Sequence, residues 1–239
     1  MKTCKFSLHL LIAIFFTVTS GAFVIDVNAQ TPQATPPPPA QPRSVQFPVP
    51  VERTLPNGLR VIVIDRPNTP LVTAQVVMKN GAEVDSPELA GLGNMLADLV
   101  TKGTQKRSAT EIAEAVEALG GSLYSSARWD STRIGVDVMS SKVSPALEIL
   151  ADVVRHPTFK DEEIERLRQQ TLDDLTVELG EPGAVARYVA SRVIFGDAPY
   201  GQPLSGTSES LARISRNDFV KYHQTWYRPD NAILVIGGD

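Results

Sequence analysis

The chain has 239 residues, of which 42% are apolar and 21% are charged, and its formal net charge is −4. This composition is typical of a globular protein with one or two domains. The negative net charge argues against a nucleic-acid-binding role. The sequence also has no basic cluster interleaved with aromatic residues, which such a role would favour. The single cysteine is Cys4, so the chain beyond it cannot form disulfides or thiolate metal sites.

Residues 1–29 have the pattern of a secretory signal peptide. Two lysines precede an apolar run from Phe6 to Val18, and small residues follow at Val27-Asn28-Ala29. The run is too short for a stable membrane span. We therefore expect export, to a bacterial periplasm, and no membrane span once the signal is cleaved. The alternatives are cleavage nearer Ser20 and an uncleaved anchor.

Residues 30–50 are rich in proline, which favours an extended linker. The folded domain is predicted over residues 51–239, opening with a turn at Asn57-Gly58. Hydrophobic periodicity and end signals predict the elements that follow. In chain order these are strands at 60–65 and 71–79, helices at 89–104 and 109–119, strands at 122–128 and 131–139, helices at 143–154, 161–179 and 183–195, two short helices within 208–226, and a strand at 232–236.

The predicted helix at 89–104 is amphipathic. Apolar residues recur at three- and four-residue steps from Leu92 to Val100, which gives one buried stripe. Asn94 and Asp98 are four residues apart, so both side chains project from the same face. Gly103 is placed to end the helix.

This stretch resembles the catalytic helix of the insulinase/pitrilysin family (M16) of zinc metallopeptidases, which includes the mitochondrial processing peptidases. The family helix carries H-x-x-E-H inside the frame G-L-x-H-x-x-E-H-x-x-x-K-G-T, and the frame is present here as Gly91-Leu92 and Lys102-Gly103-Thr104. A second family segment, P-Y-G-x-P-x-x-G-T, matches residues 199–207. The resemblance covers residues 53–239.

The residues that perform the family's chemistry are missing from that frame. Asn94 and Asp98 stand where the resemblance places the two zinc-binding histidines, and Ala97 stands at the general-base glutamate. An amide is a poor zinc ligand and a methyl group cannot accept a proton. The resemblance therefore implies no catalytic residue and no zinc in this chain, although active members bind zinc.

The third zinc ligand of the family, a glutamate, falls on Asp174, or on Asp173 if the alignment is shifted by one residue. The simplest interpretation of these carboxylates is structural. Asp174 would be a solvated charge, and Asp98 would form an ion pair with Lys102, one turn later. The alternative is a rebuilt metal site that draws on Asp98, Asp174 and His223.

The order of the elements predicts an α+β fold, a mainly antiparallel sheet with helices packed on one face. The family resemblance implies that this is half of a larger chamber, and we expect the chain to be incomplete at Asp239. The first functional hypothesis is a non-catalytic M16 unit that pairs with a homologous active subunit or a downstream half and helps to bind extended peptides by edge-strand addition. The alternatives are an active zinc endopeptidase with a rebuilt site and a structural envelope protein.

Overall fold

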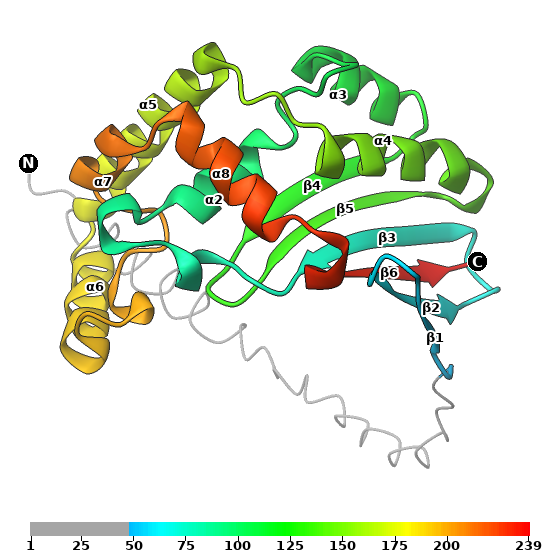
Figure 1. Cartoon of the computed structure of the whole chain (residues 1–239), viewed down its shortest axis with the longest axis horizontal. Coiled ribbons are helices and arrows are strands. Elements are labelled where there is room, and N and C mark those ends of the chain that lie inside the picture. Colours follow the sequence, from blue (N-terminus) through cyan, green and yellow to red (C-terminus); the bar gives the residue numbers. More distant parts are fainter. Residues whose placement is uncertain (1–47) are drawn as a thin grey trace, which may run out of the picture. The chain divides into compact units, whose positions relative to one another are not determined.

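Six strands form one sheet in the order β1-β2-β6-β3-β5-β4 in the computed structural model, which describes residues 48–239 (Figure 1). The predicted signal peptide and all but the last three residues of the predicted linker lie outside the described residues. The strands are β1 (Val51–Thr54), β2 (Arg60–Asp65), β3 (Leu71–Met78), β4 (Ser122–Ala127), β5 (Thr132–Met139) and β6 (Ala232–Gly238).

The sheet is mainly antiparallel, as predicted, with a single parallel pair between β2 and β6. Strands β2 and β3 follow each other in the chain, but β6 lies between them and pairs with both. The last described strand therefore occupies the middle of the sheet. It joins the β1–β2 hairpin to the other strands.

Strand β1 is an edge strand that the sequence did not predict. All four of its residues are exposed, so it has no apolar alternation that could identify it. The turn at Asn57-Gly58 is present. Gly58 has φ +90°, and the Asn57 side chain accepts a hydrogen bond from the Leu59 amide.

The helices cover one face of the sheet, as predicted (Figure 1). The described part of the chain contains α2 (Leu92–Leu99), α3 (Ala109–Glu117), α4 (Val143–Arg155), α5 (Asp161–Leu179), α6 (Pro182–Phe195), α7 (Ser208–Arg213) and α8 (Arg216–Trp226). Apart from α2, the observed bounds agree with the predicted ranges to within two residues. None of these helices is both long and apolar enough to cross a membrane.

The core lies between the sheet and helices α2, α4 and α8. On β5 the alternate residues Ile134, Val136 and Val138 are 0–3% exposed, which fixes which face of the strand meets the helices. Leu96 of α2 and Phe219 of α8 are fully buried against this layer. Helix α2 is therefore a central element, and its position is set by packing on several sides.

The predicted helix at 89–104 is wrong in its bounds. A short 3-10 turn at Pro87–Leu89 is separated from α2 by Gly91, which has the left-handed φ of +93°. The N-terminus of α2 is capped from outside the helix, because the Asp85 carboxylate accepts hydrogen bonds from the amides of Gly91 and Gly93 at 3.1–3.2 Å. Burial raises the pKa of Asp85 to about 7, although these two amide donors act in the opposite direction.

Candidate functional site

Helix α2 presents two polar side chains to the candidate site and buries the rest. Among Leu92–Leu99, Asn94 and Asp98 are the only residues that are not buried, which agrees with their predicted common face. Ala97 is 0% exposed. The position that corresponds to the family's general base is therefore sealed inside the core, and Ala97 does not line the neighbouring pocket.

Helix α5 supplies the opposite wall of a pocket of about 140 Å³. Its lining residues are Asn94, Asp98, Leu167, Gln170, Thr171, Asp174, Leu175, Glu178 and Ser205. The structure thus brings together Asn94, Asp98 and Asp174, the three positions that the sequence resemblance assigned to the zinc ligands. Asp173 does not line this pocket, and its carboxylate accepts a hydrogen bond from Gln169 at 3.0 Å. Asp174 is therefore the residue that shares the site.

A second pocket, of about 360 Å³, adjoins the first and shares Asn94, Glu178 and Ser205 with it. Helix α6 contributes Arg187, Tyr188 and Ser191 to its wall, and residues 201–205 of the P-Y-G-x-P segment close the other side. The family-like segment at 199–207 therefore lies beside the site. Its position in the sequence alone did not predict this location.

Glu178 is a site residue that the sequence analysis missed. It follows Asp174 by four residues, so a search for the same helical face could have found it. Its carboxylate accepts a hydrogen bond from Tyr188 Oη at 2.6 Å and lies 3.6 Å from Arg187 Nη2. These two contacts hold α6 against the C-terminal end of α5.

Asp98 has an unfavourable electrostatic environment. Burial raises its pKa, and the nearby positive charge of Lys102 offsets only part of that effect. The predicted ion pair between Asp98 and Lys102 is not among the direct contacts that residues 48–239 form. Asp98 is therefore a half-buried carboxylate that folding makes harder to ionise.

The donor set of this pocket does not fit zinc. Asn94, Asp98 and Asp174 offer one amide oxygen and two carboxylates, whereas catalytic zinc sites are built on imidazole nitrogens with a carboxylate or thiolate. Within residues 48–239 no group of three or more His, Cys, Asp or Glu side chains is arranged so that it could hold a metal ion.

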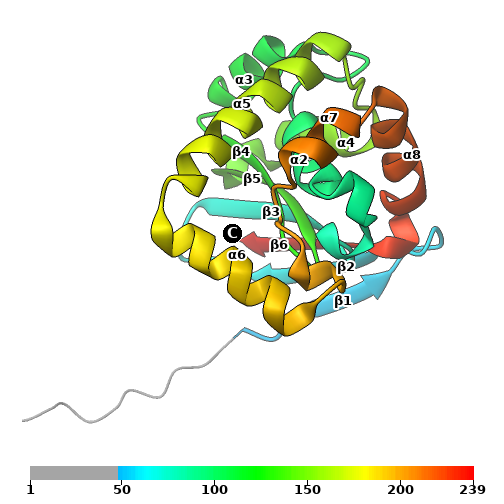
Figure 2. The ribbon, with the colours of Figure 1, turned by 90° about the vertical axis from the view of Figure 1, so that its left-hand side faces the viewer.

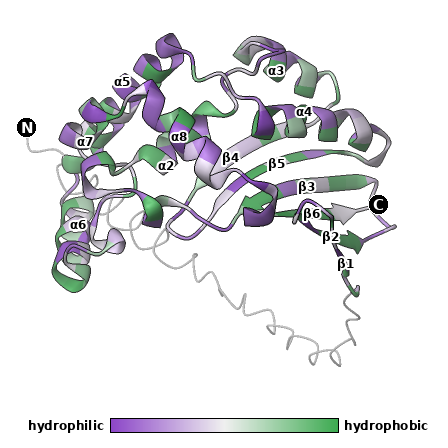
Figure 3. Cartoon of the chain, viewed as in Figure 1, coloured by the Kyte–Doolittle hydropathy of each residue, from purple (hydrophilic) through white to green (hydrophobic). Residues whose placement is uncertain are grey.

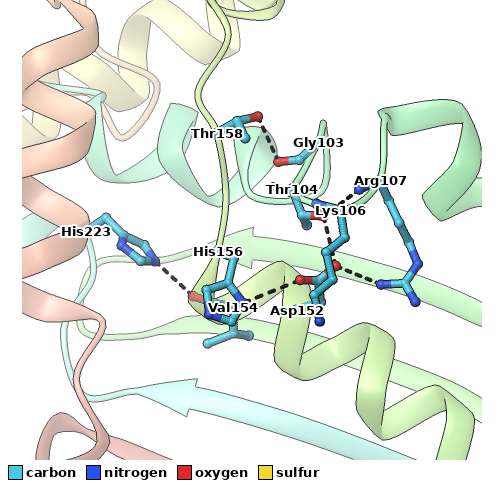
Figure 4. A network of polar contacts seen from close by, with 9 residues as sticks. All are labelled: Gly103, Thr104, Lys106, Arg107, Asp152, Val154, His156, Thr158 and His223. Atoms are coloured by element: carbon cyan, nitrogen blue, oxygen red, sulfur yellow. Dashed lines mark hydrogen bonds and ion pairs between the residues drawn. The ribbon is translucent and has the colours of Figure 1, made fainter.

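His223 lies in a different part of the molecule, so the alternative metal site on Asp98, Asp174 and His223 is wrong. His223 Nε2 lies 2.8 Å from the Val154 carbonyl oxygen (Figure 4). Its ring packs against Phe159 and Tyr227, with centroids 5.8 and 4.8 Å away. It lines an apolar groove between α4, α8 and the sheet, together with His156.

The loop after α2 is held by a buried carboxylate (Figure 4). Asp152 is 6% exposed and accepts hydrogen bonds from Thr104 Oγ1 at 2.8 Å and from Arg107 Nη1 at 2.7 Å. Burial alone would raise the pKa of Asp152, but these donors outweigh it and hold the pKa below its usual value. Thr104 ends the K-G-T part of the frame, so this contact gives Thr104 a structural role that does not depend on metal ligands.

Comparison with known proteins agrees with this architecture. The sequence pattern of the family described as Insulinase (Peptidase family M16) matches residues 60–208. The uncharacterized zinc protease YmxG of Bacillus subtilis is 26% identical over 186 residues, which are 78% of this chain and 46% of that protein. A probable mitochondrial-processing peptidase subunit beta of Arabidopsis thaliana is 28% identical over 185 residues, 77% of this chain and 35% of that protein. The chain thus spans less than half the length of these relatives.

Two solved structures share the fold. A peptidase M16 inactive domain from Pseudomonas fluorescens superposes with a TM-score of 0.77 at 22% identity, over 80% of this chain and 47% of that one. The periplasmic protease PqqL of Escherichia coli gives a TM-score of 0.72 at 15% identity, over 80% of this chain and 22% of that one. With the sequence frame, the helix positions and the family match in agreement, the chain belongs to the insulinase family of peptidases, family M16.

Proposed function

We propose that this chain provides a non-catalytic M16 unit that is exported to the periplasm, pairs with a catalytically intact M16 unit and helps to hold an extended peptide. The observation that carries the proposal is the content of α2. Asn94 and Asp98 take the places of the zinc-binding histidines, and the buried Ala97 takes the place of the general base.

The chemistry of hydrolysis requires groups that these residues lack. In H-x-x-E-H helices two imidazoles bind zinc and the glutamate takes a proton from the zinc-bound water. Losing a general base alone reduces the rate by roughly 10²–10⁴-fold. Losing the metal removes the activated water as well. The proposal therefore assigns no catalytic step to this chain.

Peptide binding is supported by the two adjoining pockets. Together they form a cavity beside α2 with a mixed apolar and polar lining. Its neutral polar groups are the amides of Asn94 and Gln202 and the hydroxyl of Ser205, and they lie beside the charged side chains of Asp98, Asp174, Glu178 and Arg187. Neutral donors and acceptors of this kind can satisfy the main chain of an extended peptide. A homologue with intact zinc ligands would supply the cleavage.

The test combines metal analysis with peptide cleavage on the purified chain after incubation with zinc. We expect less than about one tenth of an equivalent of zinc and no cleavage above background. The positive control is the triple variant Asn94→His, Asp98→His, Asp174→Glu, which places the family's donor types at these three positions of one pocket and should bind close to one equivalent. Stoichiometric zinc and peptide cleavage by the unaltered chain would overturn the proposal.

Export and pairing need a separate measurement in the organism that makes this chain. After cell fractionation we expect the protein in the periplasmic fraction. A tagged chain should co-purify with an M16 protein or segment that carries an intact H-x-x-E-H. Recovery in the cytoplasmic fraction would remove the export part of the proposal, and isolation without any such M16 sequence would remove the pairing part.

A further inference from the structure

The segment that joins β3 to α2 is held most firmly at its two ends. It comprises residues 81–91, which include two short 3-10 turns at Ala82–Val84 and Pro87–Leu89, and we call it the α2 strap. The two residues at each end are buried, whereas residues 83–89 between them are half-buried or exposed. A segment with few buried residues opens locally at a lower free energy than the core does.

One side chain joins the middle of the α2 strap to the helix. The Asp85 carboxylate accepts hydrogen bonds from the amides of Gly91 and Gly93 at 3.1–3.2 Å. The residue at the N-cap of α2 is Gly91, which has no side chain to bond these amides. Figure 3 shows that α2 itself is mostly hydrophobic. The first amides of α2, at the positive end of the helix, therefore depend on Asp85 for an acceptor.

The groups around Asp85 do not supply a cation to balance its charge. Glu83 is a second carboxylate in the α2 strap, and it accepts a hydrogen bond from the Gly81 amide at 2.6 Å. From α8, Tyr222 Oη donates to the Gly81 carbonyl oxygen at 2.8 Å. Among residues 48–239, no Lys, Arg or His forms an ion pair with Asp85. Burial, with a smaller effect of the Glu83 charge, therefore raises the pKa of Asp85 to about 7 against its amide donors.

The other elements that pack against the α2 strap carry few titratable side chains. In the turn between β4 and β5, whose backbone accepts a hydrogen bond from the Glu83 amide at 3.0 Å, these are Arg128 and Asp130. In the segment at 199–207 the only one is Tyr200, and its hydroxyl donates a hydrogen bond to Asp130. The charge of an ionised Asp85 therefore stays uncompensated within the docked strap.

The α2 strap borders the candidate site. A narrow gap beside Asp85 is lined by Trp129, Gln202 and Pro203, and the same three residues line the pocket of about 360 Å³. Figure 2 shows the segment between α6 and α7, in orange, beside α2. The first turn of α2 also carries Asn94, which lines that pocket. A strap that leaves α2 therefore frees one side of the candidate site.

We propose that the α2 strap is a pH-sensitive clasp of the candidate site, which stays docked on α2 when Asp85 is protonated and is released more readily when Asp85 is ionised. In the released strap the carboxyl group is hydrated and titrates near its ordinary pKa of 3.8. The docked strap therefore holds one additional proton between pH 3.8 and about pH 7. The equilibrium constant for opening is lowest below this window, rises by up to about tenfold per pH unit within it, and is constant above it.

Hydrogen exchange followed by mass spectrometry on the purified chain tests the clasp. The readout is the opening constant of fragments from residues 82–93, after correction for the pH dependence of intrinsic exchange. We expect this constant to rise by roughly 50-fold between pH 5 and pH 7 and to change little more by pH 8. At each pH the strap should also exchange faster than the buried part of α4. Equal protection of the two would overturn the inference, because the strap would then open only when the whole chain unfolds.

Two substitutions separate Asp85 from the other groups that titrate in this range. Asp85→Asn retains the shape of the side chain and removes its ionisation, so the rise in strap opening from pH 5 to pH 7 should fall below about threefold. Glu88→Gln is the matched control, because Glu88 is an exposed carboxylate of the same strap, and the full rise should remain. The same rise in Asp85→Asn as in the original chain would overturn the inference.

A second measurement does not depend on the variant folding. The carboxyl-carbon resonance of Asp85 in the original chain should titrate with a midpoint near pH 7, and a midpoint near the ordinary value of 3.8 would overturn the inference. None of these readouts uses a peptide or a partner. Failure to bind peptide would therefore count against the proposed function alone, and a flat pH profile of the strap would count against the clasp alone.

Discussion

Single side chains in this structure have roles that their chemical type alone does not reveal. Asp152 sits near the end of an amphipathic helix, where a carboxylate is usually solvated. Here it is buried, and it joins α4 to the loop after α2 through Thr104 and Arg107. Asp98 is the opposite case, because it is half-buried and, among residues 48–239, the charge of Lys102 compensates only part of the lost hydration.

Replacing Asp152 with alanine should destabilise the chain by about 2–4 kcal/mol, since the change leaves Thr104 and Arg107 without their buried acceptor. Urea unfolding followed by circular dichroism measures the effect. Glu148→Ala is the matched control, because Glu148 lies one turn earlier on α4 and is exposed. Equal unfolding midpoints for the two variants would contradict the role that we assign to Asp152.

Replacing Asp98 with asparagine should change how stability depends on pH. The folded-state pKa of Asp98 lies above its unfolded value of 3.8, so the native state binds the extra proton between these two values. The stability of the original chain relative to the Asp98→Asn variant is therefore highest below pH 3.8, and it falls as the pH rises through the folded-state pKa of Asp98. We expect Asp98→Asn to melt higher than the original chain at pH 7 and at the same temperature at pH 3. Equal melting temperatures of the two proteins at both pH values would contradict this role of Asp98.

At the scale of elements, the break before α2 determines how the site is built. Gly91 turns the chain with φ +93°, and a Cβ added there would lie 2.7 Å from the Ser205 carbonyl oxygen. This close approach brings the 199–207 segment against the start of α2, and Ser205 then lines both pockets. The glycine of the family frame is thus explained by packing and not by metal chemistry.

Replacing Gly91 with alanine should therefore lower the free energy of unfolding by more than the left-handed backbone conformation alone would. That conformation costs about 1–2 kcal/mol for a residue with a Cβ, and the clash with Ser205 adds to it. Gly120→Ala is the control, since Gly120 has φ +66° and nothing within 4 Å of an added Cβ. We expect Gly91→Ala to lower the free energy of unfolding by more than about 2 kcal/mol and by more than the control does. A smaller loss than at Gly120 would show that the 199–207 segment moves freely.

At the scale of the whole molecule, the sheet depends on its last strand. Strand β6 pairs along its length with β2 on one side and with β3 on the other. The β1–β2 hairpin has no other strand neighbour in the described sheet. The stability of the N-terminal hairpin is therefore tied to residues that come about 170 positions later in the chain.

Proline at Val235 should test that dependence. A proline in a central strand removes a donor and disturbs the pairing on both sides, at a cost of about 3 kcal/mol or more. Val51→Pro, at the first residue of the edge strand β1, should cost less than about 1 kcal/mol. Hydrogen exchange should show lost protection in β2 and β3 for Val235→Pro. Unchanged protection of these strands would contradict the central position of β6.

The sequence by itself determined the α+β class, nearly all helix and strand ranges, the family frame and which residues, Asn94, Ala97 and Asp98, stand at its three chemical positions. These follow from local patterns, because periodicity, caps and motif spacing are properties of neighbouring residues. Only the tertiary structure decided between Asp174 and Asp173, removed His223 from the site, and identified Glu178 and Asp152 as contacts across helices. It also placed β6 in the middle of the sheet and left Val189, Val193 and Ile194 of α6 exposed. Such features depend on which distant segments pack together, and that choice is made by burial over the whole unit and not by any one stretch of sequence.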